Sequence, residues 1–250
     1  MTDTLRGRVA LVTGAAGDGI GRSAALTLAR EGAAVAVNYR RDADDAARVV
    51  RAIEARGGRA FAIQADVGDA EAVAAMVREV ERALGPVDVL VNSAGGPWKP
   101  QDIVEIEPAH LRAVLAREVE STYSLLRAVL PGMRERRWGR VVSVGGHMAD
   151  DWRFGPPEAP LDYPLGKAAR HWLTRTLAPR EIGYGITVNA VAPGPTPHVA
   201  FEDAVRYVDA LPADAHATPQ HVAEVIAWLC SEAAARVTGA VIPLPGERPV

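Results

Sequence analysis

Short apolar runs alternate with amphipathic stretches along most of this chain. Seven apolar runs bounded by turn residues have the character of buried parallel strands, at residues 9–12, 35–37, 60–63, 87–91, 141–144, 186–191 and 240–242. Between them lie amphipathic stretches such as 70–84 and 45–56, the second with Ala46, Val49, Val50 and Ile53 on one helical stripe. This alternation predicts an α/β fold in which a doubly wound parallel sheet of about seven strands is flanked by helices.

Segments rich in glycine and proline occur after predicted strands, at residues 95–100, 145–160 and 193–197. Ligands of such sheets bind at the carboxyl ends of the strands, so we expect the functional site there. The chain shows no internal repeat, low-complexity tract or linker, and residues 1–250 are predicted to form a single domain.

Composition excludes several classes of protein. Apolar residues make up 48% and charged residues 24% of the 250, as in ordinary globular enzymes. A net charge of −3 offers no basic footprint for nucleic acid, and no apolar run approaches the ~18 residues of a membrane span. Residues 1–8 lack a secretory apolar region, and Cys230 is the single cysteine, so we expect a cytoplasmic protein without an intrachain disulfide.

A glycine-rich turn follows the first predicted strand. Residues 13–21 read T-G-A-A-G-D-G-I-G and lead into a predicted helix. Glycines at this place let the backbone approach a pyrophosphate and direct N–H groups at the helix N-terminus toward it. Gly14, Gly19, Ile20 and Gly21 are therefore candidate cofactor-binding residues of a Rossmann-type site.

Tyr163 and Lys167 lie four residues apart on a predicted helix, and therefore on one face of it. The charge of Lys167 favours the phenolate and is expected to lower the pKa of Tyr163 from about 10. The pair is a candidate acid/base centre.

Taken together, the glycine turn and the Tyr163–Lys167 pair resemble the short-chain dehydrogenase/reductase family over essentially the whole chain. The family's turn reads T-G-x-x-x-G-x-G, whereas this chain has one residue more between Gly14 and Gly19. The expansion leaves the assignment of individual phosphate contacts open.

The resemblance implies further cofactor contacts. In the family, the aspartate at the place of Asp66 bonds the adenine amino group, and N-S-A-G at 92–95 corresponds to the family's N-N-A-G. The segment 189–194 corresponds to the one that closes over the nicotinamide, and Thr196 is placed to reach the carboxamide. The cofactor-binding residues implied in this way are Asp66, Val67, Asn92, Ala94, Gly95, Tyr163, Lys167, Pro193, Gly194 and Thr196.

The residues after the second strand indicate which cofactor is bound. Family members that bind NAD have an acidic side chain there to hold the ribose 2′-hydroxyl, and alignment places Tyr39 at that position. Arg40 and Arg41 follow, and a guanidinium suits a 2′-phosphate, so NADP(H) is expected. The alternative is that both arginines are solvated charges.

Two residues of the family's active site are replaced. Alignment puts Gly146 at the usual serine and Glu118 at the usual asparagine, and the segment from Gly146 to Tyr163 is longer than usual. Ser143 lies on the opposite face of its strand by parity, so it is not a substitute. His147 is a candidate replacement donor or an ordinary surface histidine. Glu118 either lies near Lys167, which would raise the pKa of Tyr163, or points into solvent.

The sequence thus predicts an NADPH-dependent reductase acting on a carbonyl or conjugated alkene of a small apolar, aromatic or polyketide-like substrate. Tyr163 would donate the proton, Lys167 would hold the cofactor ribose, and Trp98, Trp152 and Phe154 would form an apolar substrate wall. Two alternatives remain open: a non-redox cyclase or isomerase using the same residues, and a cofactor-sensing binding protein. The resemblance also implies a homo-oligomer, either dimer or tetramer, and no metal site is expected.

Overall fold

The computed structural model describes residues 3–96, 102–147, 149, 162–212 and 217–246. In this part of the chain seven strands form one sheet: β1 (Val9–Val12), β2 (Ala34–Tyr39), β3 (Ala60–Gln64), β4 (Val89–Asn92), β5 (Gly139–Val144), β6 (Ile186–Pro193) and β7 (Val241–Leu244). They pair in parallel in the order β3-β2-β1-β4-β5-β6-β7. The predicted doubly wound parallel sheet is confirmed.

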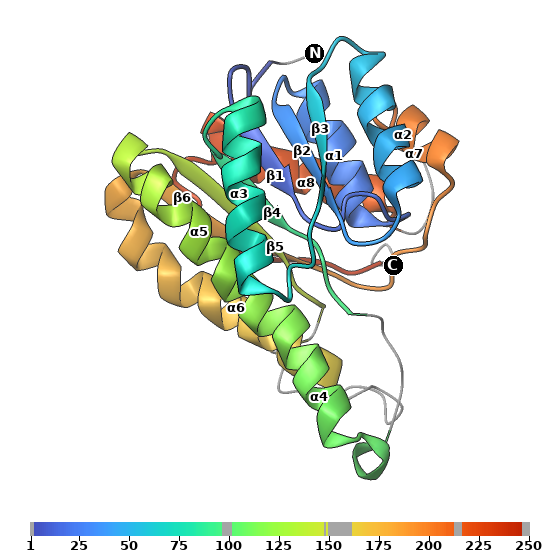
Figure 1. Ribbon diagram of the computed structural model, residues 1–250, viewed down its shortest axis with the longest axis vertical. Helices are drawn as coiled ribbons and strands as arrows, with labels where there is room; N and C mark the ends of the chain where they lie inside the picture. The colour runs from blue at the N-terminus through green and yellow to red at the C-terminus, as the bar shows by residue number, and fades with distance from the viewer. Residues whose placement is uncertain (1–2, 97–101, 148, 150–161, 213–216, 247–250) are drawn as a thin grey trace.

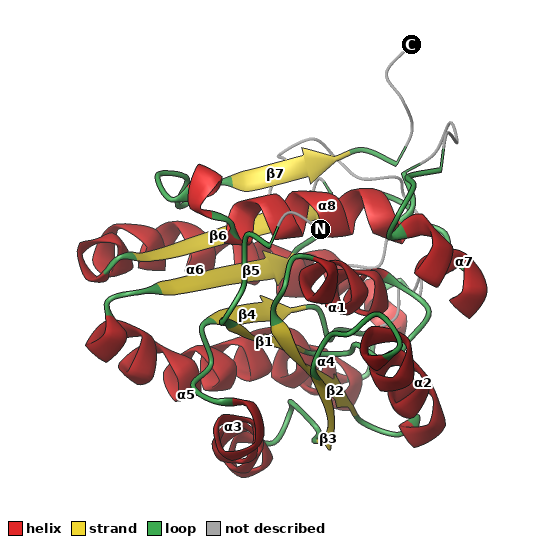
Figure 2. Ribbon diagram, turned by 90° about the horizontal axis from the view of Figure 1, so that it is seen from above, coloured by secondary structure: helices red, strands yellow, loops and turns green. Residues whose placement is uncertain are grey.

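Helices cover both faces of the sheet (Figure 2). One layer contains α1 (Ile20–Arg30), α2 (Ala43–Glu54), α7 (Phe201–Tyr207) and α8 (Pro219–Cys230), and the other contains α3 (Ala70–Leu84), α5 (Ser121–Arg136) and α6 (Asp162–Glu181). The strands are apolar on both faces because both are covered: Ala10 and Val12 pack into the first layer, and Val9 and Leu11 into the second.

The bounds of every strand except β1 differ from the prediction by one or two residues. β4, for example, was expected to begin at residue 87. The strand begins at Val89, although the backbone of Asp88 already bonds both neighbouring strands: its N–H donates to Val9 O at 2.9 Å and its carbonyl accepts the N–H of Arg140 at 3.0 Å. The carboxylate of Asp88 also accepts the N–H of Val9, at 3.1 Å, and lies 3.5 Å from the guanidinium of Arg136. Cys230 is buried, as expected of a small side chain in an apolar helix.

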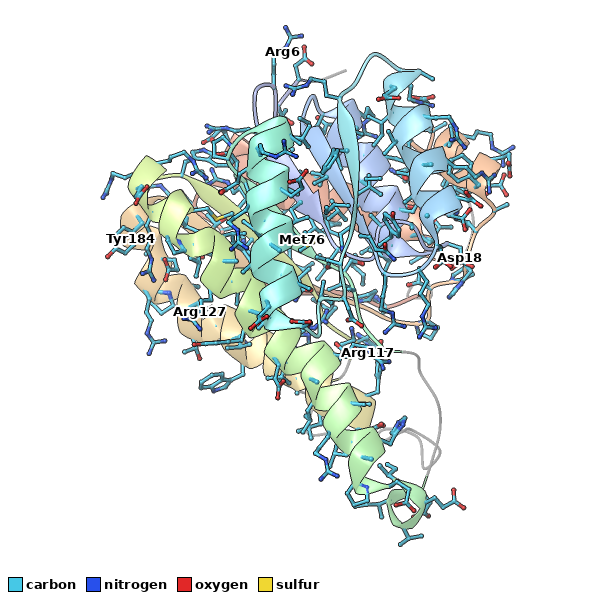
Figure 3. The ribbon with its side chains drawn as sticks, in the orientation of Figure 1. Arg6, Asp18, Met76, Arg117, Arg127 and Tyr184 are labelled. Atoms are coloured by element: carbon cyan, nitrogen blue, oxygen red, sulfur yellow. The ribbon has the colours of Figure 1, made fainter. Side chains whose placement is uncertain are left out.

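The strand order reverses between β1 and β4, so the carboxyl ends of these strands bound the crevice where ligands bind in doubly wound folds. Figure 3 shows Arg6, which precedes β1, at one end of the molecule and Arg117 toward the other, where the strands end. The predicted site residues follow these carboxyl ends.

A long rod of helix projects from the body beside this edge (Figure 1). It consists of α4 (Pro108–Leu115), the π-helical turn η2 (Ala116–Glu120) and α5, without interruption. The short helix η1 (Ile103–Glu105) precedes it, and η3 (Ile182–Tyr184) and η4 (Glu232–Ala234) follow α6 and α8. A single π-helical turn within a helix is often found at a functional site.

Searching the described residues finds no helix that is both long and apolar enough to cross a membrane.

Candidate active site

The glycine turn is held close to the loop after β4. Gly14 has a φ of +64°, and a Cβ there would lie 3.1 Å from the Cα of Ala94. A side chain on Gly21 would overlap the carbonyl oxygen of Gly14. Both glycines are therefore required by backbone packing, whereas a Cβ on Gly19 would meet open space.

The N-terminus of α1 fits an anionic ligand. Its N-cap, Gly19, makes no side-chain cap, and the first turn contains no acidic residue. The first N–H groups of a helix have no partner within the helix, and the helix dipole favours a negative charge beside them. These features fit the pyrophosphate of a dinucleotide.

Asp18, which lies within the expanded turn, contacts the segment after β6. Its carboxylate lies 2.6 Å from Nδ1 of His198, and its carbonyl accepts the N–H of Val199 at 3.2 Å. Arg22 donates to the carbonyl of Val199. Figure 3 shows Asp18 on the side of the molecule where α2 lies. The expanded turn therefore anchors the chain that follows Pro193, Gly194 and Thr196.

The residues predicted to hold the adenosine end lie together. Tyr39 is half-buried, Arg40 and Arg41 are exposed, and Nη1 of Arg40 lies 3.7 Å from Oδ2 of Asp66. The other carboxylate oxygen of Asp66 accepts the N–H of Gly68 at 3.0 Å, and Val67 is buried. The structure thus brings the predicted phosphate-binding arginine beside the predicted adenine-binding aspartate.

Asn38, which the sequence did not single out, connects three parts of this region. Its Nδ2 donates to the carbonyl of Ala65 at 3.2 Å, and its Oδ1 accepts the N–H of Gly14 at 3.3 Å. The amide therefore ties the end of β3 to the glycine turn. A polar residue directly after the apolar run 35–37 is the sequence signal that could have identified it.

The loop after β4 is also fixed internally. The hydroxyl of Thr13 accepts the N–H groups of Ser93 and Ala94, each at 3.0 Å. Nδ2 of the buried Asn92 donates to Thr122 at 2.6 Å. The Asn92 side chain thus belongs to the scaffold that positions the loop.

The helix carrying Tyr163 and Lys167 has a defined start. Oδ1 of Asp162 accepts the N–H of Tyr163 at 2.9 Å, and Oδ2 lies 2.9 Å from Nε2 of His110 on α4. The ammonium of Lys167 lies 5.2 Å from the centre of the Tyr163 ring and donates to the carbonyl of Val144 at 3.3 Å. The one-turn spacing thus brings the two side chains together at the end of β5.

Glu118 is fully buried and faces Lys167. Its Oε2 lies 3.1 Å from Nζ of Lys167 and 3.0 Å from a guanidinium nitrogen of Arg170, and its Oε1 accepts the N–H of Gly96 at 2.7 Å. The alternative in which Glu118 points into solvent is wrong. The π-helical turn that contains Glu118 places this side chain against α6.

Two glycines make room for this carboxylate. A Cβ on Gly95 would lie 2.7 Å from Oε1 of Glu118, and a Cβ on Gly166 would lie 2.6 Å from its Cβ. Both distances are too short for a real Cβ. Gly166 therefore allows η2 to approach α6 closely, and Gly95 leaves room for the carboxylate beside the loop after β4.

The predicted lowering of the Tyr163 pKa is wrong. Burial raises the pKa of Tyr163 to about 12, the negative charge of Glu118 adds to this, and Arg170 opposes it. Burial also lowers the pKa of Lys167 to about 8, with Arg170 acting in the same direction and Glu118 against it. The pKa of Glu118 is lowered, because Arg170 and Lys167 outweigh its burial. Tyr163 is therefore protonated at neutral pH.

The backbone at the missing serine is already engaged. The N–H groups of Gly145, Gly146 and His147 donate to Val191 O at 2.8 Å, Nε2 of His171 at 3.4 Å and Pro193 O at 2.9 Å. The His147 side chain is exposed. These three amides are thus not available to a substrate oxygen.

Trp98, Trp152 and Phe154, the predicted substrate wall, lie outside the described residues. The described residues contain no group of three or more histidine, cysteine or acidic side chains that could hold a metal ion.

A phosphate-binding turn at the switch point of a doubly wound sheet, with a half-buried tyrosine and a buried lysine at the end of β5, is typical of nicotinamide-dependent oxidoreductases. Comparison with known proteins gives the family. Residues 14–246 match the family model described as enoyl-(acyl carrier protein) reductase.

Relatives match over almost their whole length. The chain is 34% identical to the acetoacetyl-CoA reductase of Allochromatium vinosum, covering 96% of this chain and 97% of that protein. It is 37% identical to the cyclohexanol dehydrogenase of a Rhodococcus species, with 98% of each covered. A short-chain dehydrogenase from Burkholderia cenocepacia, solved in complex with NADP, superimposes with a TM-score of 0.82 at 32% identity, with 98% of each chain covered.

The chain belongs to the short-chain dehydrogenase/reductase family and is an enzyme of the reductase type. The family predicted from the glycine turn and the Tyr163–Lys167 spacing is confirmed.

Proposed function

We propose that this enzyme uses NADPH to reduce a carbonyl group, or a conjugated alkene, of a small substrate, with Tyr163 as the proton donor. The observation that carries the proposal is the half-buried, protonated Tyr163 beside Lys167, at the carboxyl ends of the strands, where the glycine turn also lies. A reduction requires a proton donor, and a phenol with a pKa of about 12 holds its proton at neutral pH.

The residues of the site would have separate roles in cofactor binding and proton transfer. NADPH, when bound, supplies the hydride. The N-terminus of α1 would bind its pyrophosphate, Arg40 and Arg41 its 2′-phosphate, and Lys167 its ribose hydroxyls. The hydroxyl of Tyr163 would give its proton to the substrate oxygen, or to carbon when an alkene is reduced, as negative charge develops there.

The substrate of this enzyme would itself supply a hydrogen bond to its reacting oxygen. Gly146 has no hydroxyl, and the amides of residues 145–147 are engaged within the protein. A substrate with an internal hydrogen bond, such as a 1,3-dicarbonyl or polyketide-like compound, depends least on a protein donor. The relative named acetoacetyl-CoA reductase is consistent with this substrate class.

The test is NADPH oxidation with acetoacetyl-CoA, a 1,3-diketone, cyclohexanone and an unsaturated ketone. Tyr163→Phe should lower turnover roughly 10²–10⁴-fold, the usual contribution of a positioned acid or base, and leave NADPH binding unchanged. Tyr184→Phe, an exposed residue, is the matched control. Full activity of Tyr163→Phe would show that the proton comes from another group, and substrate conversion without NADPH loss would favour the non-redox alternative.

We also propose the assembly and location expected from the resemblance. Tyr123 on α5 and Trp172 on α6 are 59% and 63% exposed, which supports contact with a second copy of the chain in a dimer or tetramer. Light scattering of the purified protein tests this, and a monomer at micromolar concentration would contradict it. A cytoplasmic location stays a prediction.

A further inference from the structure

Arg170 is a fully buried arginine on α6, one turn beyond Lys167. Its guanidinium contacts the carboxylate of Glu118 and donates to four main-chain carbonyls, those of Asn92, Ala94, Glu118 and Val144, at 3.3, 2.5, 3.2 and 3.0 Å. These carbonyls belong to the end of β4 and its loop, to η2 and to the end of β5. A single side chain thus joins three of the segments that surround Tyr163 and Lys167.

Arg170 and Glu118 depend on each other. A buried charge is costly unless it is paired and hydrogen-bonded, and among the described residues Glu118 is the carboxylate that pairs with the charge of Arg170. Glu118 in turn contacts Lys167 with the same oxygen and fixes Gly96 with the other. The carboxylate is therefore held between two cations and one backbone N–H.

We propose that Glu118 and Arg170 form one charge-compensated positioning unit: Glu118 holds the ammonium of Lys167, while Arg170 holds Glu118 and fixes the backbone at the ends of β4 and β5. This deepens the proposed function and rests on Lys167 being the lysine that acts beside Tyr163. Neither residue of the unit needs to contact the substrate.

The unit has an electrostatic signature that packing alone would not produce. Among the described residues, the charged groups that act on Lys167 are Glu118 from η2 and Arg170 from α6. β5 contributes a carbonyl, and α6 the ring of Tyr163. Glu118 raises the pKa of Lys167 and Arg170 lowers it. Removing the two charges one at a time should therefore move the titration of Lys167 in opposite directions.

The sequence makes this measurement simple, because Lys99 and Lys167 are its only two lysines. Protein labelled with ¹⁵N,¹³C-lysine gives two side-chain signals, which Lys99→Arg assigns. The pH titration is followed by NMR in the parent, Glu118→Gln, Arg170→Met and the double variant. No substrate is present, so the result does not depend on which compound the enzyme reduces or on whether Tyr163 is the proton donor.

We expect Glu118→Gln to lower the midpoint of Lys167 by about one unit or more, Arg170→Met to raise it, and the double variant to return near the parent. Arg134→Met is the matched control: it breaks another arginine–glutamate pair between α5 and α6, with Glu181, about 20 Å along the helix from Lys167. Its midpoint should equal the parent's. Midpoints that stay fixed, or move the same way in both single variants, would overturn the proposal.

Urea unfolding of the same proteins keeps the proposal testable if a single variant folds poorly. Charge compensation predicts that the double variant unfolds at a higher urea concentration than either single variant. A double variant no more stable than the weaker single variant contradicts the proposed unit.

Discussion

Replacing Arg40 by alanine should weaken NADPH binding and leave NADH binding unchanged. Arg40 contacts Asp66 at 3.7 Å with both side chains roughly half exposed, and such a pair contributes less than about 1 kcal/mol. A charged hydrogen bond to a phosphate contributes about 1.5–3 kcal/mol. After subtraction of the lost contact with Asp66, about 1–2 kcal/mol remains for the 2′-phosphate. Since 1.4 kcal/mol is tenfold in affinity, the dissociation constant for NADPH should rise about 5- to 30-fold.

The assay is fluorescence titration of NADPH and NADH at two ionic strengths, with Arg41→Ala and the double variant beside Arg40→Ala. The difference between parent and variant should shrink at high salt, because exposed charges are screened. Arg56→Ala is the control, since that arginine pairs with Asp209 away from the predicted cofactor site. Equal affinity of the parent protein for both cofactors would refute the assignment, as would a double variant that binds both as the parent does.

Three further predictions concern Lys167 and the two glycines after β5. Reduction should be fastest below pH 8 and should slow as the pH rises through the Lys167 pKa of about 8. In Lys167→Arg this decline at high pH should disappear, because the charge of arginine persists. A pH profile of kcat/KM that is flat in the parent contradicts the reasoning. Gly145→Ala should destabilise the protein by about 1–3 kcal/mol, because its Cβ would overlap Nε2 of His171. Gly183→Ala is the control: its Cβ meets open space, so the Tm measured by calorimetry should not change. Gly146→Ser should raise the turnover of simple ketones by up to about 10²-fold relative to Gly146→Ala. Both variants place a Cβ 3.1 Å from Cγ of Lys167, but only serine adds a hydrogen-bond donor. Equal rates of the two variants would show that the missing hydroxyl does not limit turnover.

The fold followed from periodicity, because strands buried on both faces and helices buried on one leave distinct patterns. The helix at 70–84 has the predicted limits, whereas β4 begins at Val89 and not at residue 87, because apolar character alone does not mark the residue at which a strand begins. The Tyr163–Lys167 pair could be predicted, since a spacing of four residues fixes a shared helical face.

The side chains around that pair were harder to predict from the sequence. The sequence did not decide whether the Glu118 side chain points toward Lys167 or into solvent. Its direction depends on a π-helical turn that has no clear sequence signal. Arg170 was missed although it lies three residues after Lys167 and so on the same face. The signal would have been that a carboxylate buried beside a lysine needs further compensation. His171 was missed because its contact with Gly146 joins residues 25 apart.

The π-helical turn also limits how this site can be transplanted. An extra residue in a helical turn rotates everything after it by about 100°, so the turn sets both the direction of Glu118 and the face that α5 presents to α3. A designer who copied Glu118 and Arg170 into a relative with an uninterrupted α-helix would aim the carboxylate elsewhere. The transferable cassette is the whole of residues 116–120 together with Gly95, Gly166 and Arg170, whose shapes fit one another.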